Sequence, residues 1–246
     1  MRSELPSAAD PTVMGPLPSV DLAVSPDGDF VGYTVERGPG LGELWLFEVD
    51  SGRSSQLVAG LGTLTDPAWS EGGDRIAFVV HDAQEASLMS VPSRGGEVEV
   101  LQTLPEQVSA LDMTSDWALA AFVPSGRQDM YIMDVAGGEV SRAWENPTGS
   151  PVRPAWSPSG EELAMSVRGQ ILLVSPATPD DVRRVPTTAE VFEIDWVADG
   201  VIVFSGRSVQ GEGDLDIFAV DVTTGSLRAL PSTLKDDRSP SFLTSG

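Results

Sequence analysis

His81 is the only histidine in the chain, and the chain contains no cysteine. A serine-based catalytic triad would have to use His81 as its general base, but no Gly-x-Ser-x-Gly motif accompanies it. The composition also excludes cysteine nucleophiles, disulfides and the common cysteine and histidine zinc sites. His81 lies in "VVHDAQEA", where two apolar runs are joined, so we expect an exposed loop histidine and no catalytic residues.

The segment "GEGDLD" is a candidate for metal binding. It places the carboxylates of Glu212, Asp214 and Asp216 within five residues, and calcium and magnesium prefer oxygen ligands. The segment lacks the D-x-[DN]-x-[DN]-G spacing of a calcium-binding loop, so we expect a solvated turn. "SPDGD", which begins at Ser25, has the residues of a tight turn. No nucleotide-binding glycine motif is present. We predict no cofactor, and a calcium ion at "GEGDLD" is the alternative to the solvated turn.

The chain is strongly acidic, with 37 acidic and 15 basic residues and a net charge of −22. Such a surface repels nucleic acid and anionic lipid, because binding either one requires lysine or arginine to neutralise phosphates. No apolar run reaches the roughly 18 residues of a membrane-spanning helix, so we predict no membrane insertion. The first twenty residues show no signal peptide. The expected location is therefore cytoplasmic, or periplasmic if a leader was removed.

One phrase recurs along the chain. It reads "DLAVSPDGDFVGYTV" from Asp21, "DPAWSEGGDRIAFVV" from Asp66, "RPAWSPSGEELAMSV" from Arg153 and "EIDWVADGVIVFS" from Glu193. Aligned at the tryptophan, the repeats share a bulky apolar residue at intervals of 45, 44, 43, 40 and 46 residues. These register residues are Val24, Trp69, Met113, Trp156, Trp196 and Phe242. A motif used this often indicates architecture, because a catalytic site needs its residues once.

Each repeat contains four apolar runs of four to seven residues, bounded by Gly, Pro, Asp and Ser. No segment of ten or more residues has a clean helical period. Four short antiparallel strands every roughly 40–45 residues predict an all-β fold, a β-propeller of four-stranded blades. We expect Trp69, Trp156 and Trp196 on the innermost strands, packed as core between neighbouring blades.

"PAWSPSGEELAMS" followed by "ILLVS", and "DPAWSEGGDRIAF", resemble the propeller repeats of TolB-like (WD40-like) proteins. Similar repeats occur in the propeller domains of prolyl-oligopeptidase-type enzymes and of the tricorn protease. The resemblance covers residues 20–246 and is clearest in the second and fourth repeats. The third, "LDMTSDWALAAF", departs most, because it lacks the proline and the Ser-Pro-Asp-Gly turn. The resemblance implies a binding propeller of the bacterial envelope, although a fold does not by itself define a function.

The repeats divide the chain into an N-terminal segment, residues 1–19, and a propeller domain, residues 20–246. The expected repeats span about 20–60, 61–104, 105–147, 148–187 and 188–232, with a partial repeat at 233–246. "PTVMG" in the N-terminal segment fits a fourth strand, and "DDRSPSFLTSG" fits a first strand. Two interpretations stay open: a truncated six-bladed propeller, which we favour, or five blades that close with the end strands as a clasp.

The first strands of a propeller line its axis. Counting three residues back from each register residue gives Asp21, Asp66, Ala110, Arg153, Glu193 and Ser239. Asp112 and Asp195 lie one residue before the register in their own repeats. Together they predict a largely acidic channel, suited to a cation or to a basic peptide end. Loops of variable length add further candidates for partner contacts: Arg37, His81, Arg127 and Arg207.

These features predict a monomeric, non-catalytic scaffold that presents loops and an acidic channel to a protein or peptide partner. One alternative is the substrate-gating propeller of a prolyl-oligopeptidase-type or tricorn-type peptidase whose catalytic domain lies elsewhere. Another alternative is a propeller hydrolase with a carboxylate-held metal, which would need several convergent oxygen ligands.

Overall fold

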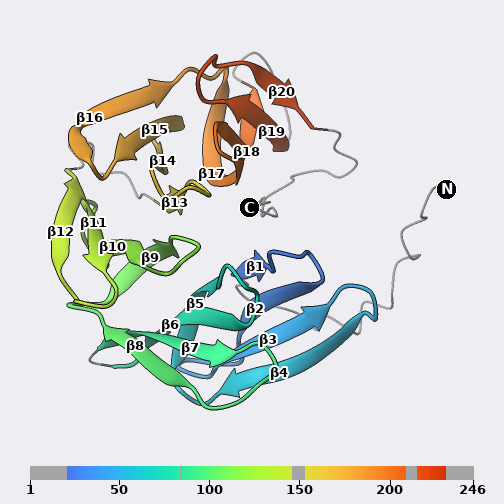
Figure 1. Cartoon of the computed structure of the whole chain (residues 1–246). Helices are drawn as coiled ribbons and strands as arrows, with labels where there is room; N and C mark the ends of the chain where they lie inside the picture. Colours follow the sequence, from blue (N-terminus) through green and yellow to red (C-terminus); the bar gives the residue numbers. More distant parts are fainter. Residues whose placement is uncertain (1–20, 84, 146–152, 209–214, 231–246) are drawn as a thin grey trace.

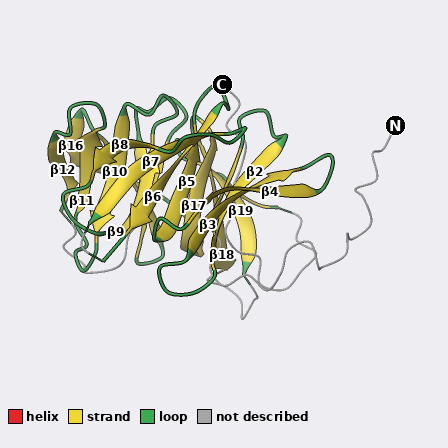
Figure 2. Cartoon of the chain, turned by 90° about the horizontal axis from the view of Figure 1, so that it is seen from below, coloured by secondary structure: helices red, strands yellow, loops and turns green. Residues whose placement is uncertain are grey.

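The computed structural model describes residues 21–83, 85–145, 153–208 and 215–230. Within these residues there is no helix, and twenty strands form five four-stranded antiparallel sheets. Figure 1 shows the sheets arranged as blades around a common axis, and Figure 2 shows them from the side. The described part of the chain is thus a five-bladed β-propeller, which confirms the predicted all-β fold. The expected strands of a sixth blade, in residues 1–19 and 233–246, lie outside the described residues.

Each blade is built from four strands that are consecutive in sequence, and the first strand is the innermost. Blade 1 comprises β1 (Leu22–Val24), β2 (Phe30–Glu36), β3 (Gly42–Glu48) and β4 (Arg53–Ala59). Blade 2 comprises β5 (Thr63–Trp69), β6 (Arg75–His81), β7 (Ala86–Pro92) and β8 (Glu99–Thr103). Blade 3 comprises β9 (Val108–Met113), β10 (Leu119–Pro124), β11 (Met130–Asp134) and β12 (Val140–Trp144). Blade 4 comprises β13 (Pro154–Trp156), β14 (Leu163–Val167), β15 (Gln170–Ser175) and β16 (Thr178–Val185). Blade 5 comprises β17 (Ala189–Ala198), β18 (Val201–Ser208), β19 (Asp216–Asp221) and β20 (Leu227–Ala229).

A tight turn joins the first two strands of a blade. In blade 1 the N–H of Gly28 donates to the carbonyl of Ser25 at 2.9 Å, and Gly28 has a φ of 79°. Glycine adopts this left-handed conformation without steric cost, so "SPDGD" is a turn, as predicted. The same position in blade 3 is occupied by Trp117, with a φ of 60°. Its indole N–H donates to the carbonyl of Trp69 at 3.0 Å, a contact that offsets strain in the repeat that departs most from the pattern.

Apolar clusters join consecutive blades at four seams. The register residues Trp69, Met113, Trp156 and Trp196 each lie in one of these clusters, and each packs against the preceding blade. The three tryptophans are 8%, 5% and 0% exposed. The prediction that they form core between blades is therefore confirmed.

Two of these tryptophans also make equivalent hydrogen bonds across their seams. The Nε1–H of Trp69 donates to the carbonyl of Ala23, and that of Trp196 donates to the carbonyl of Ala155, both at 2.9 Å. The Nε1 of Trp156 is buried and has no hydrogen-bond partner among the described residues. The seam between blades 3 and 4 therefore contains an indole N–H without a hydrogen bond, unlike the seams formed by Trp69 and Trp196.

In blade 4 the connection between the last two strands is short: β15 ends at Ser175 and β16 begins at Thr178, opposite it, so two residues join them. Throughout the described ranges no helix is long and apolar enough to cross a membrane.

Candidate functional site

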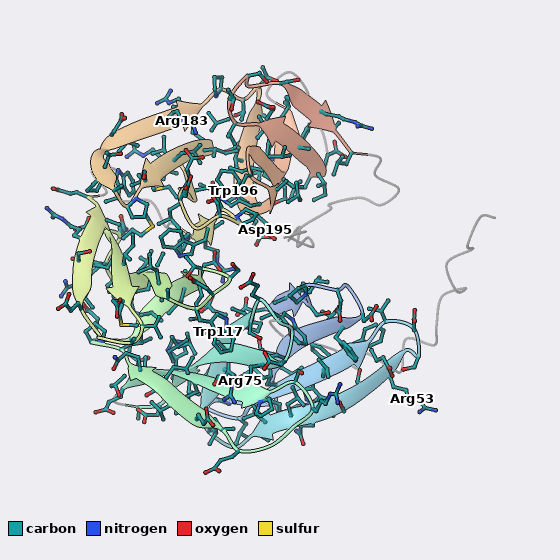
Figure 3. All side chains as sticks on the ribbon, in the orientation of Figure 1. Arg53, Arg75, Trp117, Arg183, Asp195 and Trp196 are labelled. Carbon is teal, nitrogen blue, oxygen red and sulfur yellow. The ribbon has the colours of Figure 1, made fainter. Side chains whose placement is uncertain are left out.

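The described structure has a cavity of about 430 Å³ on the propeller axis, lined by residues from β1, β5, β9, β13 and β17 or next to them. Six of its lining residues are the predicted channel residues Asp21, Asp66, Asp112, Arg153, Glu193 and Asp195. Figure 3 shows Asp195 directed toward the open centre of the ring. Ala110 is buried and is not part of the lining, and Ser239 lies outside the described residues. The positions counted back from the register residues therefore include a set of carboxylates and one arginine that line the same cavity.

Asp66 is placed by an irregularity in β5, where the strand register shifts between Thr65 and Ala68. Asp66 has a φ of 50°, a conformation that aspartate tolerates better than most residues. Its backbone N–H donates to Oδ2 of Asp21 at 3.4 Å, and its side chain is only 10% exposed. Two carboxylates from neighbouring blades are thus held close together at the axis.

Arg153, which directly precedes β13, reaches across the axis from blade 4. Its Nη2 atom lies 3.6 Å from Oδ1 of Asp21 and 3.9 Å from Oδ1 of Asp66. The Arg153 side chain is 56% exposed. These long, solvent-exposed ion pairs contribute little to stability. They do show that a guanidinium group fits between the two carboxylates.

Asp112 and Asp195 accept hydrogen bonds from the main chain of register residues. Asp112 accepts from the N–H of Met113 at 2.8 Å and from the N–H of Trp156, in the next blade, at 2.7 Å. Asp195 accepts from the N–H of Trp196 at 2.8 Å. These contacts fix the carboxylates relative to the core tryptophans, so the packed seams also position the acidic groups.

Burial changes the acidity of two of these groups. Desolvation raises the pKa of Asp66 to about 6, repulsion by Asp21 adds to the increase, and Arg153 opposes it. Desolvation likewise raises the pKa of Asp112 to about 6, against the lowering effect of the Trp156 and Met113 N–H groups. Both groups are mainly ionised at pH 7 and become protonated in mild acid.

Glu71 is a cavity residue that the sequence analysis missed. It follows the register residue of blade 2 by two positions, and its N–H donates to the carbonyl of Ser115 at 3.0 Å. Pro26, Ser115 and Pro158 occupy the same offset in their own blades, and all of them line the cavity. The offset of two residues from the register is the signal in the sequence that could have located Glu71.

His81 differs from its predicted environment. It is the last residue of β6, and it is only partly exposed. Its Nε2 lies 3.0 Å from Oγ1 of Thr65, and its Nδ1 lies 2.8 Å from Oε1 of Gln107. The expectation of an exposed loop histidine was wrong, because Gln107 of the next blade covers it. His81 is not among the cavity-lining residues.

The remaining candidates also lie away from the axial cavity. Arg37 pairs with Glu43 at 3.0 Å, Arg127 pairs with Glu106 at 3.5 Å, and Arg207 is exposed on β18. Glu212 and Asp214 lie outside the described residues, and Asp216 begins β19. Within the described ranges, no group of three or more acidic or histidine side chains is placed to hold a metal ion.

No known family model matches the chain. In sequence it is similar to a Bacillus subtilis protein described as the uncharacterized peptidase YuxL, with 23% identity over 234 residues. This similarity covers 92% of the chain but only 28% of that protein.

Several solved structures have the same fold. TolB from Acinetobacter baumannii matches with a TM-score of 0.67 and 18% identity, over 88% of this chain and 53% of that chain. A chain of the nidogen/laminin complex gives 0.65 and 11%, over 84% and 76% of the two chains. A puromycin hydrolase gives 0.60 and 15%, over 85% and 36%. The chain therefore has a TolB-like propeller fold, and it spans about half the length of the TolB chain.

Proposed function

We propose that the chain is a non-catalytic binding scaffold whose axial cavity receives a cationic group of a protein or peptide partner. The observation that carries this proposal is the composition of the cavity wall. Six carboxylates face one arginine: Asp21, Asp66, Glu71, Asp112, Glu193 and Asp195. A concave site lined by one sign of charge concentrates ligands of the opposite sign and speeds their encounter.

Arg153 supports the choice of ligand. Its guanidinium group lies within 4 Å of carboxylate oxygens of both Asp21 and Asp66, on a side chain that is more than half exposed. An arginine side chain or a free amino terminus of a partner has the charge and hydrogen-bond donors to occupy a similar position. The ligand class is thus a basic peptide segment, and Arg153 competes with it for the same oxygens.

The similarity to TolB and to a chain of the nidogen/laminin complex is consistent with a protein-binding role, since the latter structure is a protein complex. We place the partner contact at the axial cavity because its charged groups are held by the packed seams. A preorganised site loses less conformational entropy on binding than a mobile one.

The test is calorimetric titration with a penta-arginine peptide, with a penta-citrulline peptide of the same length as the neutral control. We expect binding of the first peptide only. Replacing three cavity carboxylates, as in Asp66→Asn/Glu193→Gln/Asp195→Asn, should weaken binding by about tenfold or more, because each lost charge removes part of the attraction.

A matched variant separates the site from the overall charge of the protein. Asp50→Asn/Glu97→Gln/Glu139→Gln removes the same number of charges from exposed residues outside the cavity lining. It should change the affinity by no more than about twofold, because distant exposed charges are screened by salt. Equal weakening in both variants would mean that the peptide responds to net charge and not to the cavity.

The second candidate function is a substrate-gating propeller of a larger peptidase. It is favoured by the similarity to YuxL, which is described as a peptidase, and by the fold shared with a puromycin hydrolase. The native gene distinguishes the two candidates. If the same reading frame encoded a hydrolase domain with a nucleophile motif, the chain would be the gating propeller of a peptidase and not a binding scaffold.

A further inference from the structure

His81 belongs to a hydrogen-bonded network at the seam between blades 2 and 3. Ala77 and Val79 of β6 pack in the apolar cluster of this seam. Since alternate residues of a strand point to the same face, His81 at the end of β6 also faces blade 3. Thr65 of β5 is paired with Val79 and therefore lies on the same face, diagonally across from His81. His81 and Thr65 thus form the polar end of an otherwise apolar seam.

Gln107, which directly precedes β9, holds the imidazole on one side. Its side-chain Nε2 donates to the carbonyl of Asp82 at 3.1 Å and to the carbonyl of Glu85 at 2.7 Å. These two bonds fix the orientation of the amide, so that Oε1 faces Nδ1 of His81 at 2.8 Å. An amide oxygen can only accept a hydrogen bond, so Nδ1 of His81 must carry a hydrogen.

The other ring nitrogen contacts a hydroxyl with two partners. Nε2 of His81 lies 3.0 Å from Oγ1 of Thr65. The Asp66 side chain is the second hydrogen-bond partner of the Thr65 hydroxyl. A hydroxyl carries a single hydrogen, which it can donate to the carboxylate or to the ring nitrogen, but not fully to both. A change at one of these acceptors therefore alters the hydrogen bond to the other.

Asp66 is held from behind and contacts a cation in front. On the wall of the cavity its side chain accepts hydrogen bonds from Thr65 and from the N–H of Leu111 in β9, a strand that adjoins β5 (Figure 1). On the open side, Nη2 of Arg153 lies 3.9 Å from Oδ1 of Asp66. The Thr65 hydroxyl is therefore placed directly behind a carboxylate that faces a guanidinium group.

We propose that His81 is a positioning residue of the axial cavity. Its imidazole, anchored by Gln107, fixes the Thr65 hydroxyl beside Asp66 and so orients a carboxylate that receives the cationic group of the partner. This inference rests on the proposed function of the cavity. Because the hydroxyl hydrogen is shared, a cation bound to Asp66 changes the hydrogen bond at Nε2 of His81. The imidazole therefore responds to occupation of a cavity that it does not line.

The test records the imidazole by nuclear magnetic resonance. The chain contains one histidine, so a nitrogen–proton correlation spectrum of the ring shows one imidazole and needs no assignment. We expect Nδ1 to carry a hydrogen. The Nε2 signal should move when penta-arginine saturates the cavity, and it should stay in place with penta-citrulline. A neutral ring protonated at Nε2 alone would contradict the network.

Variants of Thr65 separate positioning from packing. Thr65→Val keeps the shape of the side chain but removes the hydroxyl, so it should weaken penta-arginine binding by about threefold or more and abolish the response of Nε2. Thr65→Ser keeps the hydroxyl and should keep both. Ser109→Ala is the matched control, because Ser109 occupies the same position relative to the register in blade 3 and its hydroxyl donates to the carbonyl of Val123 at 3.2 Å. It should change neither.

The outcomes distinguish this inference from the proposed function. If the wild type binds penta-arginine while the Nε2 signal stays in place, the inference fails and the cavity keeps its role. The same holds if Thr65→Val binds as tightly as the wild type, or if Ser109→Ala weakens binding equally. If the wild type does not bind penta-arginine, the proposed function fails and this inference fails with it.

Discussion

Lowering the pH from 7.5 to 5 should increase the free energy of unfolding by roughly 2–3 kcal/mol. The cause is the burial of Asp66 and Asp112, which raises the pKa of each from 3.8 to about 6 in the folded state. Between these values the folded protein binds more protons than the unfolded chain, so protonation favours folding. Each of the two groups contributes roughly half of this increase at pH 5 by this linkage. The gain is absent above about pH 7 and levels off below about pH 4.

Urea denaturation at a series of pH values measures this effect. Asp66→Asn should reduce the increase by about half, because it removes one of the two titrating groups while asparagine still tolerates the φ of Asp66. Asp50→Asn, at an exposed position in the turn after β3, should leave the increase unchanged. The exposed groups with lowered pKa values, including those of Asp27 and Asp221, act in the opposite direction only below about pH 4. A free energy of unfolding that decreases as the pH is lowered from 7.5 to 5 would contradict the assignment of raised pKa values to Asp66 and Asp112.

Trp196→Ala should lower the free energy of unfolding by about 3–5 kcal/mol, since Trp196 is the largest fully buried side chain of the described residues. Trp196→Phe should cost less, because most of the apolar volume remains. It still removes the hydrogen bond that the indole N–H donates to the carbonyl of Ala155 across the seam. Trp156→Phe removes an indole N–H that has no partner among the described residues, so it loses no such bond.

Chemical denaturation of the three variants distinguishes packing from hydrogen bonding. Trp196→Phe should be destabilised by about 1–2 kcal/mol more than Trp156→Phe. Equal effects of the two phenylalanine substitutions would show that the seam hydrogen bond contributes nothing beyond packing. A Trp196→Ala variant as stable as the wild type would contradict the role of the register residues as the core between blades.

The repeated phrase was sufficient to predict the blades, because its two levels of periodicity have separate physical causes. Alternation within the runs marks strands, and the period of the register residue marks one large side chain per seam. The same numbering located the axial carboxylates of Asp21, Asp66 and Glu193, since the innermost strands run alongside the axis. Local sequence therefore encodes both the stacking of the blades and the position of the acidic groups.

The errors arose where distant residues decide the environment. His81 looked like a loop residue because its own segment is polar, but Gln107 from the next blade accounts for its partial burial and for one of its hydrogen bonds. The raised pKa values of Asp66 and Asp112 depend on burial by neighbouring blades, which one repeat does not reveal. Trp117 in a left-handed turn is explained only by its contact with Trp69.

The most direct test of the acidic cavity as a cation-binding site is the affinity of Arg153→Gln for the penta-arginine peptide, measured by calorimetry beside the wild type. Removing the internal guanidinium group frees the oxygens of Asp21 and Asp66. We expect the variant to bind the peptide about three- to tenfold more tightly, as the loss of a like-charged competitor requires. Weaker binding by Arg153→Gln would mean that Arg153 contributes to the contact, and the cavity would not be a site for a cationic partner.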